Sequence, residues 1–302
     1  MDLKSKIILI AGPTASGKSN FAIKLAKKIN GEIINADSMQ IYKELQILTA
    51  RLKKKDQKNI KHYLYGFQSI NKKFSTGAWL KLAVKKIKEI QKKNKTPILV
   101  GGTGLYFKSL INGLVKMPNI PSKIRNQIRL IQKKIGQDFF YKKLLKLDPL
   151  IENRINPNDV QRTIRAYEIK KYTKISMTDW FKNTKIIFSK DSFIKIYIDF
   201  PRTELIQRIN KRTQKMLDQG AINEVRRFSK LKIKKDNSAN KIIGIKEILK
   251  LLQGECSLSE VKDQISIKTR QYAKRQSTWA RGQMTDWQKI EPQNLKLVLK
   301  KF

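Results

Sequence analysis

Residues 7–19 read IILIAGPTASGKS, and the fold of the chain can be predicted outward from this stretch. Its last eight residues fit G-x-x-x-x-G-K-[ST], the pattern of a loop that binds phosphate groups. The apolar run at 7–10 predicts a buried parallel strand, because such strands are covered on both faces. Residues 18–29 carry an apolar stripe at helical spacing. Strand, loop and helix in this order predict a phosphate-binding unit of an α/β protein.

The composition of the loop explains why phosphate is its expected ligand. Its residues are Gly12, Pro13, Thr14, Ala15, Ser16, Gly17, Lys18 and Ser19. Glycines let consecutive N–H groups point at one anion, and the N-terminus of the following helix adds positive partial charge. Lys18 is expected to reach the outer phosphate, and the Ser19 hydroxyl to bind Mg²⁺. Because most loops of this pattern hold ATP or GTP, a nucleotide is the first ligand to weigh.

The composition indicates a soluble protein with an anionic partner. Among 302 residues, Lys and Arg number 66 and Asp and Glu 24, and this net charge of +42 favours nucleic acid. The alternative is that lysines spread over the whole chain form only a solvated surface. No apolar run reaches the roughly 20 residues of a membrane span. The N-terminal apolar run leads into the phosphate loop, so we do not expect a signal peptide.

The single cysteine and the single histidine limit the chemistry further. Cys256 has no second cysteine with which to form an intramolecular disulfide, which fits a reducing, cytoplasmic compartment. With His62 alone, a zinc site built from a His and Cys cluster is excluded.

Strand-like and helical segments alternate in the first hundred residues. Strands are predicted at 7–10, 32–35, 97–100 and 193–200, and the first helices at 18–29 and 77–93. This alternation predicts an α/β fold with a P-loop-type parallel sheet flanked by helices.

Between the third and fourth strands the pattern becomes purely helical. Helices are predicted there at 121–135, 137–147 and 157–172. We therefore predict a catalytic core at 1–116 and 190–302, and an all-helical insertion domain at 117–189.

A helix predicted at 257–281 is opened by a capping box of Ser257 and Glu260. Its large apolar residues recur every seven positions, and we expect them to form a buried stripe. They are Ile265, Tyr272 and Trp279.

Polar or small residues follow the second and third strands, at the edge where doubly wound sheets bind ligands. Asp37 follows the second strand and could be a metal ligand, a general base or simply a cap of the next turn. The third strand ends in Gly101, Gly102 and Thr103, where an NTPase often has an acidic residue that holds Mg²⁺. Glycines there permit close approach of a ligand, and Thr103 offers a neutral hydroxyl.

Two helix faces combine cations with groups that bind bases. The first holds Gln161, Arg162 and Arg165, and the second holds Arg270, Lys274, Gln276, Trp279 and Arg281. Charged helix faces are often merely solvated. Here, however, amides that can read base edges and an aromatic ring that can stack on a base are interleaved with the cations, so contact with RNA is predicted.

Six motifs occur in order along the chain: GPTASGKS, NADSMQIYK, LVGGTGLYF, MPNIPSKIR, NPNDVQRTIRAYE and KRQSTWAR. In order and spacing they resemble the bacterial tRNA dimethylallyltransferases (the tRNA isopentenyltransferase family) over nearly the whole chain. The resemblance implies transfer of a dimethylallyl group from dimethylallyl diphosphate to N6 of the adenosine next to the anticodon, at position 37. The substrates would be tRNAs that read codons beginning with U, and diphosphate would be released.

The resemblance also implies how substrates and cofactor are held. The target adenine would be flipped into a channel, and Mg²⁺ would be the cofactor. The enzyme would be a cytoplasmic monomer that binds the anticodon stem-loop of tRNA and no membrane.

The resemblance assigns roles to particular residues. Asp37 would be the general base, Thr103 would hold the target nucleotide, and Lys18 with the loop would bind the diphosphate. An arginine further along, Arg212 or as second choice Arg208, could complete the diphosphate cradle. Besides Asp37 and Thr103, the implied tRNA path comprises Ser38, Met39, Gln40, Arg125, Gln161, Arg162, Thr163, Ile164, Arg165, Lys241, Gly244, Lys246, Lys274, Arg275, Gln276, Trp279 and Arg281.

Other functions remain to be weighed against this one. A P-loop small-molecule kinase would explain the loop but not the DSMQ and KRQSTWAR stretches. An isopentenyltransferase acting on free adenylate would share the core but has less use for a basic C-terminal helix. A non-catalytic RNA-binding protein would not need both Lys18 and Asp37. The chain departs from the family's usual Gly-Thr-Ala-Lys run at Leu48-Thr49-Ala50-Arg51, and from its usual Tyr at Ile245.

Overall fold

The structure, a computed structural model, describes residues 3, 5–231, 233 and 237–302. It divides into a core unit, Met1–Ile111 with Phe188–Phe302, and an insertion unit, Asn112–Ile187. The sequence pattern places the insertion at 117–189, so its expected ends lie slightly later in the chain than those of the observed unit.

Among the described residues, six strands form one parallel sheet in the core unit, in the order β3-β2-β4-β1-β5-β6. The strands are β1 Ile7–Ala11, β2 Gly31–Asn35, β3 His62–Tyr63, β4 Thr96–Gly101, β5 Phe193–Ile198 and β6 Gln288–Ile290. The four strands predicted from the sequence are confirmed, and the short edge strands β3 and β6 were missed. Ala11 pairs with Gly101 and with Tyr197, so the phosphate loop begins where its neighbouring strands also end.

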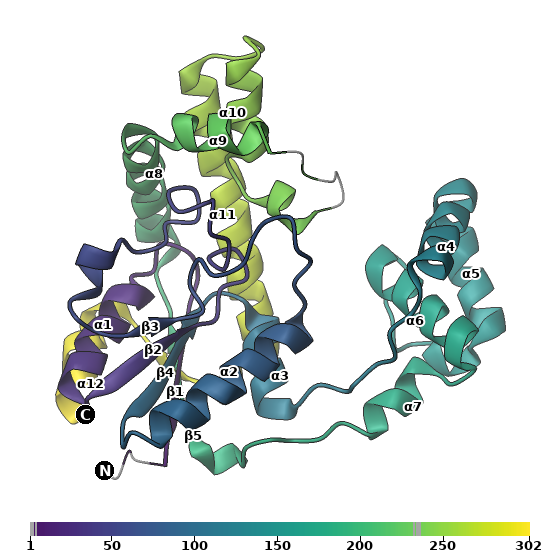
Figure 1. The fold of residues 1–302 in the computed structure, drawn as a ribbon, viewed down its shortest axis with the longest axis horizontal. Helices are drawn as coiled ribbons and strands as arrows, with labels where there is room; N and C mark the ends of the chain where they lie inside the picture. The colour runs from purple at the N-terminus through teal and green to yellow at the C-terminus, as the bar shows by residue number, and fades with distance from the viewer. Residues whose placement is uncertain (1–2, 4, 232, 234–236) are drawn as a thin grey trace. The chain divides into compact units, whose positions relative to one another are not determined.

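Helices cover both faces of the sheet (Figure 1). On one face lie α1 Lys18–Lys28 and α12 Leu295–Lys301, packed on Ile8, Ile10 and Ile98. On the other lie α2 Thr76–Gln91 and α3 Gly104–Asn112, packed on Leu9 and its neighbours. The doubly wound α/β fold predicted from the sequence is thereby confirmed.

A further group of helices completes the core unit (Figure 1). These are α8 Arg202–Asp218, α9 Ala221–Ser229, α10 Ile245–Leu252 and α11 Leu258–Gln283. Two of them, α8 and α11, contact the phosphate loop. α8 packs against α11, and the loop at 41–48 shares an apolar cluster with all four helices. Ile245, one of the departures from the family pattern, is buried in that cluster.

The start of α11 is as predicted, but its buried stripe is not. Ser257 Oγ accepts a hydrogen bond from Glu260 N, and Glu260 Oε2 accepts one from Ser257 N, which completes the capping box. Ile265 is buried as expected. Tyr272 and Trp279, by contrast, are only partly buried, because they stand beside cavities rather than inside the packed core.

The insertion unit is an all-helical bundle with its own apolar core. Its helices are α4 Ser122–Ile135, α5 Gln137–Leu147, α6 Val160–Thr173 and α7 Met177–Lys182. The ring of Phe140 lies against that of Tyr167 at the centre of this core. Short 3-10 helices complete the chain: η1 Lys54–Gln57 and η3 Lys190–Ser192, η4 Ser238–Lys241 and η5 Pro292–Asn294 in the core unit, and η2 Pro149–Ile151 in the insertion.

Candidate active site

The phosphate loop joins β1 to α1, and its backbone is curled. Ala15 and Gly17 both have positive φ, 65° and 87°. Alternation of left-handed with ordinary backbone turns successive N–H groups toward one point, which is the geometry of an anion nest. Lys18 Nζ donates a hydrogen bond to Pro13 O at 3.0 Å, so the lysine lies folded over its own loop.

Two side chains from distant helices hold the loop from outside. Gln276 of α11 accepts a hydrogen bond from Thr14 N at 2.8 Å, and its Nε2 donates to Gly102 O at 2.9 Å. Arg208 of α8 donates from Nε to Ala15 O at 2.8 Å. The one glutamine therefore ties the phosphate loop to the end of β4, and such paired bonds keep the loop in its curled form.

A crevice of about 440 Å³ opens over the loop, and its walls are strongly cationic. The cations that line it are Lys18, Arg208, Lys211, Arg212 and Lys215. Asp37 is the acidic residue in this wall. Such an excess of positive charge around a nest of N–H groups is suited to a ligand with several negative charges, such as a diphosphate.

Asp37 stands at the carboxyl end of β2, in a turn fixed by Asn35. Asn35 Nδ2 donates to Asp37 O at 2.9 Å, and Asp37 N donates to Asn35 Oδ1 at 2.8 Å. Asp37 Oδ1 accepts a hydrogen bond from Met39 N at 2.9 Å. The side chain is thus held in one orientation through a hydrogen bond to one of its two oxygens.

The charge on Asp37 influences several buried groups around it. Burial lowers the pKa of Lys18 to about 8, an effect that the nearby Asp37 carboxylate reduces and Arg212 reinforces. Burial also lowers the pKa of Arg212, again opposed by Asp37. On the other side, burial and then Asp37 raise the pKa of Tyr272. The negative charge of Asp37 therefore acts both on the cations of the crevice and on Tyr272.

One further cavity shares Asp37 with the crevice, and another is lined by the two residues that follow it, Ser38 and Met39. The first, of about 300 Å³, shares Thr14, Asp37 and Arg212 with the crevice and is otherwise lined largely by apolar side chains such as Met216 and Ile265. The second, of about 310 Å³, has mostly apolar walls. Its lining includes Thr103, Phe107, Tyr197, Tyr272 and Trp279. Flat aromatic walls of this kind suit a planar ring such as a nucleobase.

Thr103 sits in the wall of this second cavity and is tied to the turn after Asp37. Its Oγ1 accepts a hydrogen bond from Ser38 N at 2.9 Å and donates one to Ser38 Oγ at 3.2 Å. The ends of β2 and β4 are thus joined through one hydroxyl. Ser38, Met39 and Thr103 line this cavity together, whereas Asp37 lines the crevice; their predicted roles in binding tRNA stay predictions.

These features agree with what the chain resembles. A protein-family model described as IPP transferase matches residues 40–283. The chain belongs to this family.

Individual members of the family resemble the chain over nearly its whole length. The tRNA dimethylallyltransferase of Pelagibacter ubique is 64% identical over 302 residues, which cover 100% of this chain and 96% of that protein. The tRNA dimethylallyltransferase of Rickettsia massiliae is 44% identical over 284 residues, 94% of this chain and 78% of that protein.

Solved structures of the family have the same fold. The tRNA isopentenylpyrophosphate transferase of Bacillus halodurans is 30% identical with a TM-score of 0.70, covering 98% of this chain and 95% of that one. A eukaryotic dimethylallyltransferase, solved acting on tRNA, is 30% identical with a TM-score of 0.82, covering 95% of this chain and 73% of that one.

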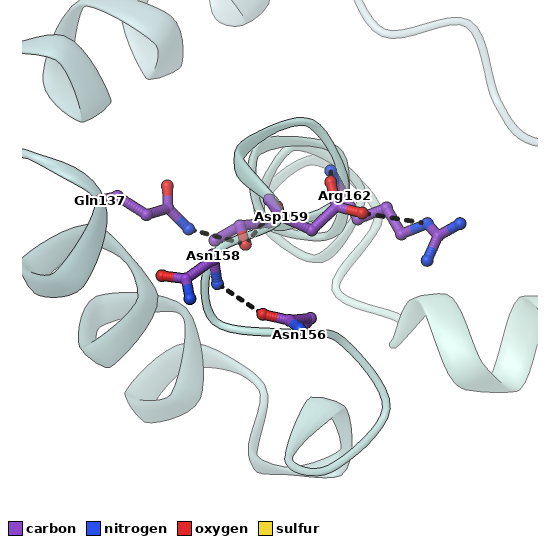
Figure 2. A network of polar contacts seen from close by, with 6 residues as sticks. Gln137, Asn156, Asn158, Asp159 and Arg162 are labelled. Atoms are coloured by element: carbon purple, nitrogen blue, oxygen red, sulfur yellow. Dashed lines mark hydrogen bonds and ion pairs between the residues drawn. The ribbon is translucent and has the colours of Figure 1, made fainter. Parts of the chain in front are cut away.

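The structure also shows how the candidate tRNA residues of the insertion unit lie. Asp159 caps α6, because its Oδ1 accepts a hydrogen bond from Arg162 N at 3.0 Å, and Oδ2 lies 3.5 Å from Arg162 Nε (Figure 2). Gln161 and Arg162 are exposed. Thr163 and Ile164 are buried, so the prediction that they line the tRNA path is wrong; at helical spacing these two positions face the core of the unit.

The candidate tRNA residues of the core unit are divided in the same way. Those with exposed side chains are Lys241, Lys246, Lys274, Arg275 and Arg281. Gly244 is buried, has φ of 104° and precedes the first residue of α10, where it packs under Leu48. The prediction that Gly244 lines the tRNA path is therefore corrected. Gln276 bonds the loop, and its predicted contact with tRNA stays untested.

Sequence reasoning missed Glu224, which shapes one wall of the site. This buried carboxylate on α9 accepts hydrogen bonds from Gln46 N, Ile47 N and Leu48 N at 2.7, 2.8 and 2.9 Å. The turn that it holds brings Leu48 and Thr49 into the wall of the 300 Å³ cavity. No local pattern reveals such a role, because the partners stand more than 170 residues apart.

Two observations concern membranes and metals. Across the described residues, the structure contains no helix that is both long and apolar enough to cross a membrane. Within the same residues, no group of three or more His, Cys, Asp or Glu side chains is placed to hold a metal ion.

Proposed function

We propose that this chain is a tRNA prenyltransferase that moves a dimethylallyl group from dimethylallyl diphosphate to N6 of an adenosine in tRNA and releases diphosphate. The single observation that carries the proposal is the position of Asp37: it lines the cationic phosphate crevice, and its charge raises the pKa of Tyr272, which lines the neighbouring aromatic-walled cavity. The family and its named relatives support the same reaction. We further propose position 37 of tRNAs that read codons beginning with U as the target.

The diphosphate of the donor is held by the loop. Its N–H groups and Lys18 face the crevice, and Arg212 stands in the opposite wall on α8. An allylic carbon–oxygen bond breaks readily when the charge that grows on the departing diphosphate is stabilised. Fixed donors aimed at that charge need no reorganisation as the bond breaks, so they lower the barrier.

Asp37 is proposed to act as the general base for the acceptor, N6 of the target adenine. Adenine N6 is a poor nucleophile, because its lone pair is delocalised into the ring, and it becomes more reactive as its proton leaves. A carboxylate within hydrogen-bond reach of N6 accepts that proton while the new carbon–nitrogen bond forms. The Met39 N–H bond to Oδ1 orients the carboxylate, and Thr103 holds the adjoining turn in place.

The residues present fit Mg²⁺ as a companion of the diphosphate. The Ser19 hydroxyl and the Asp37 carboxylate line the same crevice. Mg²⁺ commonly takes one or two protein oxygens together with phosphate oxygens and water, so a larger acidic cluster is not required. When bound, the ion would neutralise charge on the leaving diphosphate.

The tRNA is proposed to bind through its anticodon stem-loop. Exposed cations on α11, Lys274, Arg275 and Arg281, lie on the same helix as two walls of the aromatic cavity, Tyr272 and Trp279. Because N6 must reach Asp37 at the bottom of a crevice, the target base has to leave the stack. A monomeric, cytoplasmic enzyme stays our prediction.

One assay tests this function against its rivals. Labelled dimethylallyl diphosphate is incubated with Mg²⁺, the enzyme and either bulk tRNA, AMP or no acceptor, and ATP hydrolysis is followed in parallel with tRNA present. We expect label in tRNA alone and no turnover of ATP to ADP. Label in AMP would favour the free-adenylate enzyme, and ATP turnover a kinase or ATPase.

A further inference from the structure

The insertion unit contains a buried carboxylate surrounded by arginines. Glu168 on α6 has a side chain only 2% exposed. Arg165 Nη1 donates a hydrogen bond to its Oε2 at 3.2 Å, and Arg125 Nε lies 3.5 Å from the same oxygen. Arg129 Nε lies 4.0 Å from Oε1. The carboxylate is covered, whereas the three arginine side chains are 38%, 41% and 36% exposed for residues 125, 129 and 165.

The charges of this cluster do not cancel. One carboxylate faces three guanidinium groups, so the described members carry a net charge of +2. A buried carboxylate requires compensation, but a single arginine in good geometry would supply it. Each guanidinium has five N–H groups in a planar fork, and most of these are not used on Glu168. The cluster therefore retains both charge and donors for a second anion.

The backbone that carries the cluster is firmly packed. Arg125 and Arg129 stand one turn apart on α4, and Arg165 and Glu168 one turn apart on α6. Next to these positions, Ile128 of α4 and Ile164 of α6 are buried in the core of the unit, so the two helices are held against each other. The carboxylate lies at the junction of the helices, where it accepts a hydrogen bond from Arg165 of α6 and forms ion pairs with Arg125 and Arg129 of α4. Without it, three guanidinium groups would repel one another and spread into solvent.

We infer that Arg125, Arg129 and Arg165 form one site for a phosphodiester of the RNA, and that Glu168 is its positioning residue. The inference rests on the proposed function for the identity of the anion. A phosphodiester is the fitting ligand because planar guanidinium forks bind phosphate oxygens in pairs. Arg129 is thereby added to the residues that bind RNA, which from the sequence include Arg125 and Arg165. Glu168 acts through these three arginines without touching RNA.

The first test replaces the acid with its neutral isostere, Glu168→Gln. Simple electrostatics predicts tighter tRNA binding, because a negative charge disappears from an RNA-binding face. If Glu168 positions the arginines, the opposite is expected. We expect the KM for tRNA to rise about tenfold, which corresponds to the loss of roughly one well-formed phosphate contact. We expect kcat at saturating tRNA and KM for dimethylallyl diphosphate to change by less than about twofold. Tighter or unchanged tRNA binding by a folded variant would overturn the inference.

A second pair of variants decides the matter even where Glu168→Gln does not fold. Arg129→Ala removes one cluster cation, and Lys133→Ala removes one exposed charge a turn further along α4. We expect Arg129→Ala to weaken tRNA binding and to reduce the log–log salt slope by about one, and Lys133→Ala to do neither. Equal effects of the two variants would overturn the site. Binding of tRNA is measured by filter retention under conditions in which no prenyl transfer takes place, so the result does not depend on the reaction. If wild type binds tRNA but transfers no prenyl group, the proposed function fails and the site still stands.

Discussion

The lowered pKa of Lys18 predicts that the phosphate donor binds less tightly as pH rises through 8. Burial brings this pKa down to about 8, so the lysine loses its charge in an accessible pH range. A bound diphosphate raises the pKa again, because its negative charge favours the protonated amine. Binding therefore selects the protonated form, and the affinity is full below pH 8 and lost above it.

The size of the effect follows from the pKa. About nine tenths of Lys18 is protonated at pH 7 and about one tenth at pH 9, so the Kd for dimethylallyl diphosphate should rise about tenfold between them. The diphosphate itself contributes less, because the last pKa of a phosphate group lies near 6, below this range. Near pH 8, binding should also take up about half a proton.

Isothermal titration with Mg²⁺ at several pH values measures the affinity, and titration in two buffers of different ionisation enthalpy measures the proton uptake. Lys18→Met should bind weakly and without pH dependence over this range. Lys215→Met, which removes a cation from the wall of the same crevice, should lower the affinity while keeping the pH profile. A wild-type Kd that is unchanged from pH 7 to pH 9 would refute the reasoning.

Three other substitutions test the site. Asp37→Asn should keep tRNA binding but slow single-turnover prenylation about 10²- to 10⁴-fold, and a rate within threefold of wild type would contradict the assignment. Glu224→Gln should lower the free energy of unfolding in urea by about 1.5–3 kcal/mol, because three backbone N–H groups lose a charged acceptor. Gln276→Ala should raise the Kd of the donor about tenfold, because the Thr14 N–H loses its buried partner. Loss of tRNA binding with normal donor affinity in this variant would favour the RNA contact instead.

The parts of the site that could be predicted from the sequence are those encoded in short, continuous segments. The phosphate loop is one, because its glycines, Lys18 and Ser19 act through the backbone turn they share. Asp37 is another, because the end of a buried strand fixes where the next residue stands. The edge strands β3 and β6 were missed because two or three residues carry too little periodicity to be distinguished from a loop.

Residues that act across the fold could not be predicted with their correct roles. The sequence predicts an RNA contact for Gln276, which stays a prediction, but it gives no sign that its amide accepts a hydrogen bond from Thr14, 262 residues earlier in the chain. The spacing of Tyr272 and Trp279 predicts a buried stripe, although Trp279 is also a candidate for stacking on a base, because a helix face that lines a cavity shows the same apolar spacing as one that packs on another helix. Periodicity reports which face is apolar, whereas only the assembled fold decides whether that face meets a side chain or a substrate.

The end of β4 shows why a loop common in ATPases can serve a different reaction. A Cβ at Gly101 would overlap the backbone of Ala36, including its carbonyl oxygen, so no larger side chain fits at this point beside the phosphate loop. An acidic residue that holds a metal and positions water for ATP hydrolysis therefore cannot stand there without moving β2. The carboxylate of this site comes instead from Asp37 on the next strand, two residues beyond the end of β2 and in the wall of the crevice. That carboxylate lines the cationic crevice one residue before Ser38, which lines the aromatic cavity, and we propose that it accepts a proton from an incoming amine. The loop amides accept any diphosphate, so the steric limit at Gly101 and the carboxylate of Asp37 in the crevice fit the proposed group transfer better than ATP hydrolysis.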